Sequence, residues 1–170
     1  MNKTYNPQEN EDQIYQKWEK SGFFNPDKLP LDSEAPNYTI ILPPPNITAK
    51  LHLGHAATIA IEDLFIRFHR LNGYRTLWLP GTDHAAIATQ NVVEKKILKE
   101  ENKTRHDLGR ELFLEKTWSF VKETQSTILD QIKKMGASID WSRQAFTLDE
   151  DRQKAVRKIF VDMYQEGVIY

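Results

Sequence analysis

The chain has 170 residues, enough for one domain with a buried core, and its 23 basic and 24 acidic residues give a formal net charge of −1. The chain therefore has no global excess of basic charge of the kind that binds nucleic acid or an acidic membrane surface. The absence of cysteine excludes disulfides, thiolate metal ligands and a cysteine nucleophile. Apolar runs are far shorter than the roughly 18 residues of a membrane span, and the polar opening MNKTYNPQENEDQ is no secretory signal. A cytoplasmic location is expected.

A helix is predicted near the N-terminus. Asn6-Pro7 resembles an N-cap followed by proline at the first helical position, and Gly22 is a natural helix stop. The apolar positions between them recur at helical spacing: Ile14, Tyr15 and Trp18. A polar, proline-containing segment leads on from there, so residues 1–37 are predicted to form an N-terminal helix and lead-in.

The next segment, residues 38–100, predicts an α/β unit. Apolar strands are expected at residues 38–42 and 76–79, with a helix between them that ends at Gly73. The apolar face of that helix is predicted as Ala57, Ile61, Leu64, Phe68 and Leu71. Strand, helix and strand form a βαβ unit with parallel strands and a right-handed crossover. No more than two parallel strands are recognisable, so the sheet is expected to be incomplete.

Each predicted strand ends in an unusual turn. The first turn, PPPNITAKLHLGH, covers residues 43–55, and the second, PGTDH, covers residues 80–84. Ligands of open α/β sheets bind beyond the carboxyl ends of the strands. We therefore expect the two turns to lie side by side at one edge of the sheet and to enclose a single cavity.

The remaining residues, 101–170, are predicted to be a helical continuation. One long helix is expected over about 104–135, with apolar residues on one stripe: Leu108, Leu112, Trp118, Val121, Ile128 and Ile132. A further helix is expected to begin at Thr147, where Thr-Leu-Asp-Glu matches a capping box. Its buried face is predicted as Val156, Ile159, Phe160 and Met163, with Gly167 closing it.

The two histidines of the first turn, His52 and His55, admit three interpretations. They can donate hydrogen bonds to phosphate oxygens at a helix N-terminus, whose free N–H groups and positive dipole suit an anion. They can cap the helix. They can also bind a metal together with Asp83 and His84, which would indicate a metal-dependent hydrolase. The prolines and Gly54, which favours close approach of a ligand to the backbone, have no evident role in a metal site.

The three prolines, Pro43, Pro44 and Pro45, stiffen the turn and leave it carbonyls but no N–H donors. Stiff carbonyls beside a carboxylate suit an ammonium group, and Asp83 is the obvious carboxylate. The alternative for Asp83 is an Asx-turn or an N-cap of the helix that begins near Ala85. Asn46 and Thr48 can serve as turn formers or as ligand donors, and on their own they favour turn formers. Gln90, one turn into the next helix, is interpreted as structural.

These motifs resemble a known family. His52-Leu53-Gly54-His55 is similar to the HIGH signature of class I aminoacyl-tRNA synthetases. The pair PPPNITAKLHLGHA and GTDHAAIATQ resembles the valine–tRNA ligase family in particular, as do the later stretches NKTRHDLGRE, GASIDWSR and EGVIY. The resemblance runs from about Tyr5 to the last residue. It implies the first half of a Rossmann-like nucleotide-binding fold, parallel strands with a crossover helix, followed by long helices.

The resemblance also implies a reaction and its residues. Valine and ATP, with Mg²⁺, would give valyl-adenylate and pyrophosphate, and the valyl group would then pass to tRNA(Val). His52, Gly54, His55 and Thr48 would bind ATP, with His52 and His55 at its phosphates. Valine would be held by Asp83 and the Pro43–Asn46 turn: Pro43, Pro44, Pro45 and Asn46. No tightly bound protein metal is implied.

Some family features are absent from this sequence. The Lys-Met-Ser-Lys-Ser loop, the editing domain and the anticodon-binding region have no counterpart here. Ala49 and Ala86 stand where the family usually has glycine, and alanine at a positive φ would be strained. The chain alone is therefore expected to be weakly active or inactive. The alternative is a non-catalytic fragment that binds ATP or an amino acid.

Overall fold

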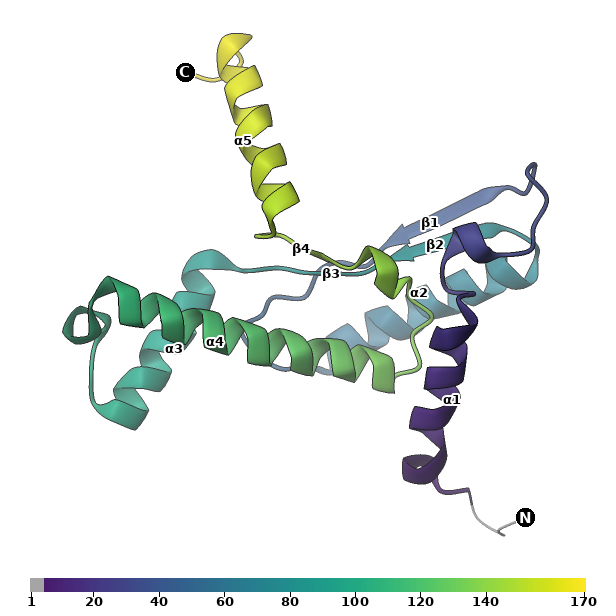
Figure 1. Ribbon diagram of the computed structural model, residues 1–170, viewed down its shortest axis with the longest axis horizontal. Coiled ribbons are helices and arrows are strands. Elements are labelled where there is room, and N and C mark those ends of the chain that lie inside the picture. The colour runs from purple at the N-terminus through teal and green to yellow at the C-terminus, as the bar shows by residue number, and fades with distance from the viewer. Residues whose placement is uncertain (1–4) are drawn as a thin grey trace.

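The computed structural model describes residues 5–170, so the first four residues of the predicted 1–37 segment lie outside the described residues. Its α-helices and β-strands are, in chain order, α1 (Pro7–Ser21), β1 (Asn37–Ile41), α2 (Leu53–Leu71), β2 (Arg75–Leu79), β3 (Gly81–Thr82), α3 (Ala86–Glu101), α4 (Arg105–Lys134), β4 (Ala145–Phe146) and α5 (Glu150–Gln165) (Figure 1). Short 3₁₀ turns occupy Pro26–Lys28 and Trp141–Arg143.

The predicted βαβ unit is present. Strands β1 and β2 are parallel, in a register that pairs Asn37 with Arg75 and Ile41 with Leu79. Helix α2 connects them. Within this helix the Asp63 carboxylate and the Arg67 guanidinium, four residues later, form an ion pair at 2.5 Å. The core formed by this unit and α4 centres on large side chains with no exposure: Ile47, Ile66, Trp78, Ile128, Ile132 and Ile139.

A second pair of parallel strands, not predicted from the sequence, follows β1 and β2. After β2 the chain stays extended as β3, which pairs in parallel with β4 (Gly81 with Ala145, Thr82 with Phe146). Two backbone hydrogen bonds extend this pairing beyond β3 and β4. The Asp140 N–H donates to the Trp78 carbonyl (3.1 Å), and the Thr147 N–H donates to the Thr82 carbonyl (3.1 Å). Residues 140–147 thus run along the side of β2 and β3 that β1 does not occupy.

Helices α3 and α4 pack together around a second small core of Val93, Ile97 and Phe113. Helix α4 begins with a capping box, in which the Thr104 hydroxyl and the Asp107 carboxylate satisfy each other's backbone N–H groups. Gly109, at φ 73°, interrupts the first part of the helix. Of the stripe predicted for α4, Val121, Ile128 and Ile132 are buried, but Leu112 and Trp118 are exposed.

The apolar face predicted for α2 does not pack against the core. Its five residues are exposed: Ala57, Ile61, Leu64, Phe68 and Leu71. Ile59 and Ile66, on another side of the helix, are buried instead. The helix has apolar residues on more than one side, so spacing alone does not decide which side meets the sheet.

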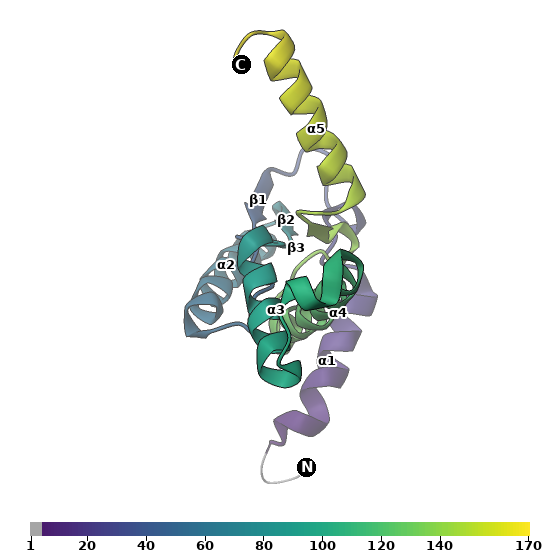
Figure 2. The ribbon, with the colours of Figure 1, turned by 90° about the vertical axis from the view of Figure 1, so that its left-hand side faces the viewer.

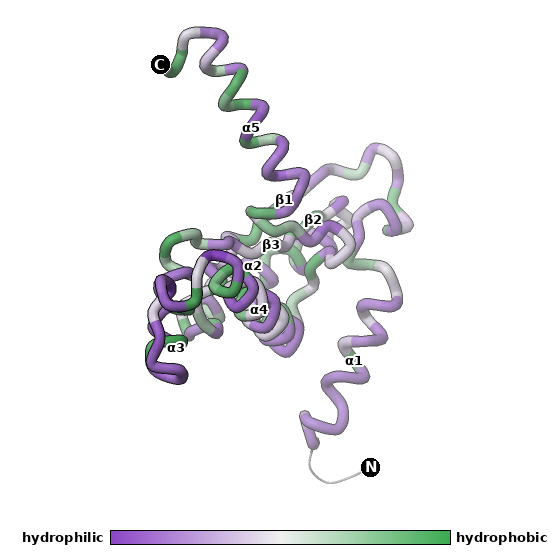
Figure 3. Tube along the Cα trace, turned by 60° about the vertical axis from the view of Figure 1, so that its left-hand side comes forward, coloured by the Kyte–Doolittle hydropathy of each residue, from purple (hydrophilic) through white to green (hydrophobic). Residues whose placement is uncertain are grey.

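The predicted buried face and start of α5 are wrong. The helix begins at Glu150 with Asp149 as its N-cap, not with Thr147. None of its residues is buried, and Val156, Ile159 and Phe160 are more than half exposed. Figures 1 and 2 show α5 projecting away from the other elements, and Figure 3 shows hydrophobic positions along this projecting segment. No surface within residues 5–170 covers them.

Helix α1 ends as predicted, with Gly22 in the left-handed region at φ 76°, although the Asn6 side chain makes no cap hydrogen bond. Its one buried residue, Tyr15, donates a hydrogen bond to the Ala137 carbonyl (2.8 Å) and accepts one from the Trp141 indole (2.7 Å). Burial raises the pKa of Tyr15 to about 12, which keeps this donor protonated. In the described part of the chain, no helix has the length and apolar character required to cross a membrane.

Candidate functional site

The two unusual turns lie side by side, as predicted. Asn46 and Asp83 form an isolated parallel bridge. The Asp83 N–H donates to the Pro45 carbonyl (2.9 Å), and the Ile47 N–H donates to the Asp83 carbonyl (3.0 Å). The proline turn thus uses one of its carbonyls to hold the second turn, because proline has no N–H to offer. Part of the second turn, Gly81–Thr82, is strand β3.

The first turn leads into the N-terminus of α2, where both histidines cap the helix. His52 is the N-cap residue, and its Nδ1 accepts a hydrogen bond from the Gly54 N–H (3.0 Å). The His52 N–H in turn donates to Nδ1 of His55 (3.2 Å). Their ring centroids lie 3.9 Å apart. The capping interpretation is therefore correct, but it occupies only one nitrogen of each ring.

The hydrogen bonds decide which nitrogen of each neutral ring carries the proton. Nδ1 of both His52 and His55 accepts from a backbone N–H, so in the neutral form the proton must sit on Nε2. Desolvation, with a smaller contribution from His52, lowers the pKa of His55 and favours this neutral form. Each ring can thus present an Nε2–H donor at the positive end of α2.

Gly54 also leaves room for the His52 ring, in addition to allowing a ligand to approach the backbone. A Cβ at this position would lie 2.9 Å from Cε1 and 3.0 Å from Nδ1 of His52. The missing side chain therefore provides space for the His52 ring to fold back onto the start of the helix.

A cavity of about 340 Å³ lies where the proline turn meets the start of α2. Its lining includes Pro43 and Pro45 from the turn, and His52, Gly54 and His55 from the helix start. Apolar walls with a few polar groups are typical of small-molecule sites. The structure thus brings together residues predicted for valine with residues predicted for ATP.

Three residues predicted to bind the ligands do not line this cavity: Pro44, Asn46 and Thr48. Pro44 and Asn46 are exposed, and Thr48 is half-buried. Asn46 takes part in the bridge to Asp83 through its backbone. Ala49 is not at a positive φ, whereas Ala86 (φ 37°) and its neighbour Ala85 (φ 50°) are. Alanine is therefore strained at one of the two positions questioned from the sequence.

Asp83 does not cap α3, because the N-cap residue is Ala85. Its side chain is 32% exposed, and its Oδ1 accepts a hydrogen bond from the Thr147 hydroxyl (2.8 Å). Nδ1 of His84 lies 3.5 Å from the same oxygen. Both His84 and Gln90 line a second cavity, of about 270 Å³, between α3, α4 and β4. Asp83 does not line the cavity beside His52, so the two turns are neighbours without enclosing one common cavity.

The metal-site interpretation of His52, His55, Asp83 and His84 has no geometric support. Within residues 5–170, no three His, Asp or Glu side chains converge as a metal ion would require. His52 and His55 instead use Nδ1 to cap α2, whereas Asp83 and His84 contact Thr147.

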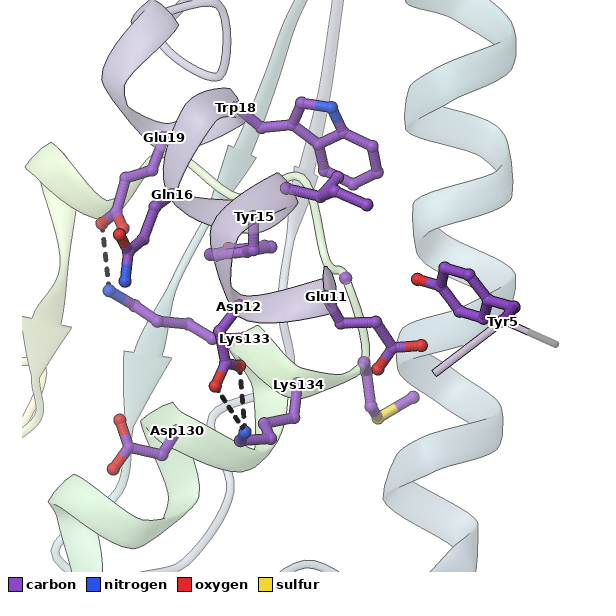
Figure 4. Close-up of a pocket in the computed structure, with 13 residues that line it drawn as sticks. Tyr5, Glu11, Asp12, Tyr15, Gln16, Trp18, Glu19, Asp130, Lys133 and Lys134 are labelled. Atoms are coloured by element: carbon purple, nitrogen blue, oxygen red, sulfur yellow. Dashed lines mark hydrogen bonds and ion pairs between the residues drawn. The ribbon is translucent and has the colours of Figure 1, made fainter. Parts of the chain in front are cut away.

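A larger cavity of about 660 Å³ lies elsewhere, between α1 and the C-terminal end of α4 (Figure 4). Its charged groups are largely engaged with one another: Lys133 pairs with Glu19 and Lys134 with Asp12, each at 3.0 Å. Neither of the two sheet-edge turns contributes to it. These ion pairs join α1 to α4, so we regard this cavity as part of a helix contact rather than as the functional site.

Sequence reasoning missed Thr147 as a neighbour of Asp83. It lies beside Asp83 because β4 pairs with β3, a contact between segments more than sixty residues apart. The Thr-Leu-Asp-Glu pattern concealed this contact, because it favoured a helix cap.

Comparison with known proteins identifies the family of this chain. Residues 13–170 match the family model described as "tRNA synthetases class I (I, L, M and V)". The fold matches a solved ternary complex of Agrobacterium radiobacter K84 agnB2 LeuRS with tRNA and LeuAMS, with a TM-score of 0.76 over 98% of this chain and 19% of that chain, at 19% identity. The chain belongs to the class I tRNA synthetases, and the predicted Rossmann-like α/β fold class is confirmed.

The particular relatives are valine–tRNA ligases. That of Treponema denticola is 51% identical over 170 residues, which is all of this chain and 18% of the relative. Mitochondrial valine–tRNA ligase 1 of Arabidopsis thaliana is 52% identical over 170 residues, and the enzyme of Thermotoga maritima is 48% identical over 166. The chain spans 15% to 19% of the length of these relatives.

Proposed function

We propose that this chain is the N-terminal part of the catalytic domain of a cytoplasmic valine–tRNA ligase. Such an enzyme activates valine with ATP and transfers the valyl group to tRNA(Val). The observation that carries the proposal is the bridge between Asn46 and Asp83, which sets the proline turn beside the Asp83 turn at the end of the sheet. The start of α2 follows the first of these turns directly.

In this proposal His52 and His55 hold the phosphates of ATP. A carboxylate oxygen of valine attacks the α-phosphorus, the bond from that phosphorus to its bridging oxygen breaks, and pyrophosphate leaves. Negative charge on the phosphate oxygens grows as the pentavalent centre forms. Nε2–H donors placed in advance at the end of α2 would stabilise that charge without a covalent enzyme intermediate. Gly54 and Thr48 would lie against the rest of ATP.

Valine is proposed to contact both the proline turn and Asp83, which are neighbours although they enclose no common cavity. The carboxylate of Asp83 is partly exposed, and it would accept hydrogen bonds from the ammonium group. The turn of Pro43, Pro44, Pro45 and Asn46 would form a stiff wall for the side chain. Mg²⁺ would accompany ATP, because it binds substrate phosphates and keeps several of its waters.

The domain division stays part of this proposal. Residues 1–37 would be the lead-in, residues 38–100 the first half of the Rossmann-like domain, and residues 101–170 its helical continuation. Helices α3 and α4 share a core across the boundary at residue 100, which supports treating both parts as one catalytic domain.

The test is valine-dependent exchange of pyrophosphate into ATP, measured on the full-length protein that carries these residues and on the 170-residue chain. We expect exchange with the full-length protein and little or none with the chain alone. A second candidate is a non-catalytic module that binds ATP or an amino acid, favoured by the small share of the relatives' length that the chain spans. A full-length protein that binds ATP but shows no valine-dependent exchange would support that candidate instead.

A further inference from the structure

The hydroxyl of Thr147 lies at the centre of a group of polar atoms beside Asp83. It donates to Oδ1 of Asp83 (2.8 Å), and it accepts from the backbone N–H of His84 (2.9 Å). Nδ1 of the His84 ring lies 2.6 Å from the same oxygen. The position of Thr147 is itself fixed, because its own N–H donates to the Thr82 carbonyl (3.1 Å).

A hydroxyl has one proton to donate and two lone pairs that accept. The ionised carboxylate of Asp83 can only accept, so the proton of Thr147 points at Asp83. The close contact with the His84 ring must then run the other way, with Nδ1–H of His84 as donor. All three hydrogen-bonding positions of Thr147 are thereby used, so its hydroxyl has no freedom to rotate.

The same contacts divide the two oxygens of Asp83. Every side-chain hydrogen bond and ion pair that the described residues make to this carboxylate goes to Oδ1. Oδ2 therefore remains for a ligand, and a carboxylate held at one oxygen keeps the other in a set direction. Orientation of this kind lowers the cost of ordering a side chain when a ligand binds.

We propose that Thr147 is a positioning residue for the amino acid: its hydroxyl locks the Asp83 carboxylate so that Oδ2 faces the ammonium group of the substrate. This inference rests on the proposed function, because it takes the ligand of Asp83 to be an amino-acid ammonium group. Thr147 acts through Asp83 and does not itself touch ATP. Its removal should therefore weaken amino-acid binding and spare the nucleotide.

The test compares three variants of the full-length protein by pyrophosphate exchange. Thr147→Val keeps the branched shape and the backbone N–H but removes the hydroxyl, whereas Thr147→Ser keeps the hydroxyl. Thr127→Val is the matched control, because within residues 5–170 the Thr127 hydroxyl bonds only the Glu123 carbonyl of its own helix (3.0 Å). Thermal midpoints of all variants show whether the fold is intact.

We expect Thr147→Val to raise KM for valine about tenfold, equivalent to about 1.4 kcal/mol, and to leave KM for ATP within twofold. Thr147→Ser and Thr127→Val should stay within about threefold of the unmodified protein for both substrates. The proposal is overturned if Thr147→Val leaves KM for valine unchanged, if it raises both KM values alike, or if Thr147→Ser is as impaired as Thr147→Val.

The failure of this inference is distinguishable from that of the proposed function. Absence of valine-dependent exchange in the unmodified protein would sink the function, and the inference with it. Normal exchange in the unmodified protein together with an unaffected Thr147→Val would sink the inference alone. As an independent readout, ¹⁵N spectra of histidine-labelled protein should show the neutral His84 ring protonated at Nδ1, and Thr147→Val should shift that proton toward Nε2. An unchanged tautomer in this variant would contradict the hydrogen-bond assignment.

Discussion

Substitution of Gly54 by alanine should impair the proposed function of the start of α2 and leave the stability of the fold nearly unchanged. The added Cβ would lie 2.9 Å from Cε1 of His52, so the imidazole ring must rotate away. The ring is an exposed side chain, so its movement costs little except the cap hydrogen bond from the Gly54 N–H, worth about 1 kcal/mol. Alanine is also the better helix former by up to about 1 kcal/mol. The two terms nearly cancel, and the free energy of unfolding should change by less than about 1 kcal/mol.

Activity should respond far more strongly than stability. In the proposed site, a displaced His52 would no longer present its Nε2–H to phosphate, and a hydrogen bond to a charged group is worth about 1.5–3 kcal/mol. We therefore expect kcat/KM for ATP, measured by pyrophosphate exchange in the full-length protein, to fall about 10- to 150-fold.

Gly81→Ala is the matched control for this experiment. A Cβ at Gly81 would meet the Ala145 carbonyl at 3.5 Å and Pro44 at 3.7 Å, which are ordinary contacts. This variant should keep nearly full activity. If Gly54→Ala retains wild-type kcat/KM, or loses activity only in proportion to a loss of folded protein, then His52 does not act as the structure suggests.

Two further predictions concern stability, measured by urea denaturation of the 170-residue chain. Ala86→Gly should stabilise the chain by up to about 1 kcal/mol, because Ala86 lies at φ 37°, where alanine is strained. The control Ala88→Gly, within the same helix, should destabilise the chain by about 0.5–1 kcal/mol. Equal destabilisation by both substitutions would show that Ala86 is not strained. Burial raises the pKa of Glu62, whose side chain accepts a hydrogen bond from the Trp78 indole (3.0 Å). The stability contributed by the protonated Glu62 side chain is therefore fully present below about pH 4.5 and is lost as pH rises through the raised pKa. Glu62→Gln does not titrate and should gain stability relative to the parent chain between pH 4.5 and pH 7; a difference independent of pH would contradict this.

The parts of the fold that the sequence predicted well depend on neighbours in the chain. The apolar run at residues 38–42, the crossover helix and the run at residues 76–79 form a βαβ unit by local pattern, and parallel pairing follows from the connection. The adjacency of the two turns then follows from that topology. This is why one edge of the sheet was predicted correctly before its neighbours were known.

The flank formed by residues 140–147 escaped prediction because it carries little strand pattern. Strand β4 has two residues, and the stretch is held to β2 and β3 by backbone hydrogen bonds that any sequence can make. The start of α5 was placed wrongly for a related reason. Thr147 and Asp149 are both good caps, and Asp149 takes the role by accepting from the Arg152 N–H (2.9 Å), which leaves the Thr147 hydroxyl for Asp83.

Periodicity predicted an apolar face on α2 and a buried face on α5, but it does not identify what such a face packs against. On α2 the sheet and α4 cover Ile59 and Ile66, while Ile61, Leu64 and Phe68 stay exposed. The same limit applies to the cavities. Sequence placed the proline turn and Asp83 together, but side-chain contacts that span the chain decide which cavity each residue lines.

The most direct test of the proposed site is the substitution Asp83→Asn in the full-length protein, with KM for valine and for ATP measured in the same pyrophosphate exchange assay. Asparagine keeps an oxygen for the Thr147 hydroxyl but loses the charge that would attract an ammonium group. We predict a rise in KM for valine of about 10- to 150-fold, with KM for ATP within about threefold. Asp151→Asn, at an exposed position of α5, should change neither value. Equal rises for valine and ATP in Asp83→Asn, or no rise in either, would contradict the placement of valine at Asp83.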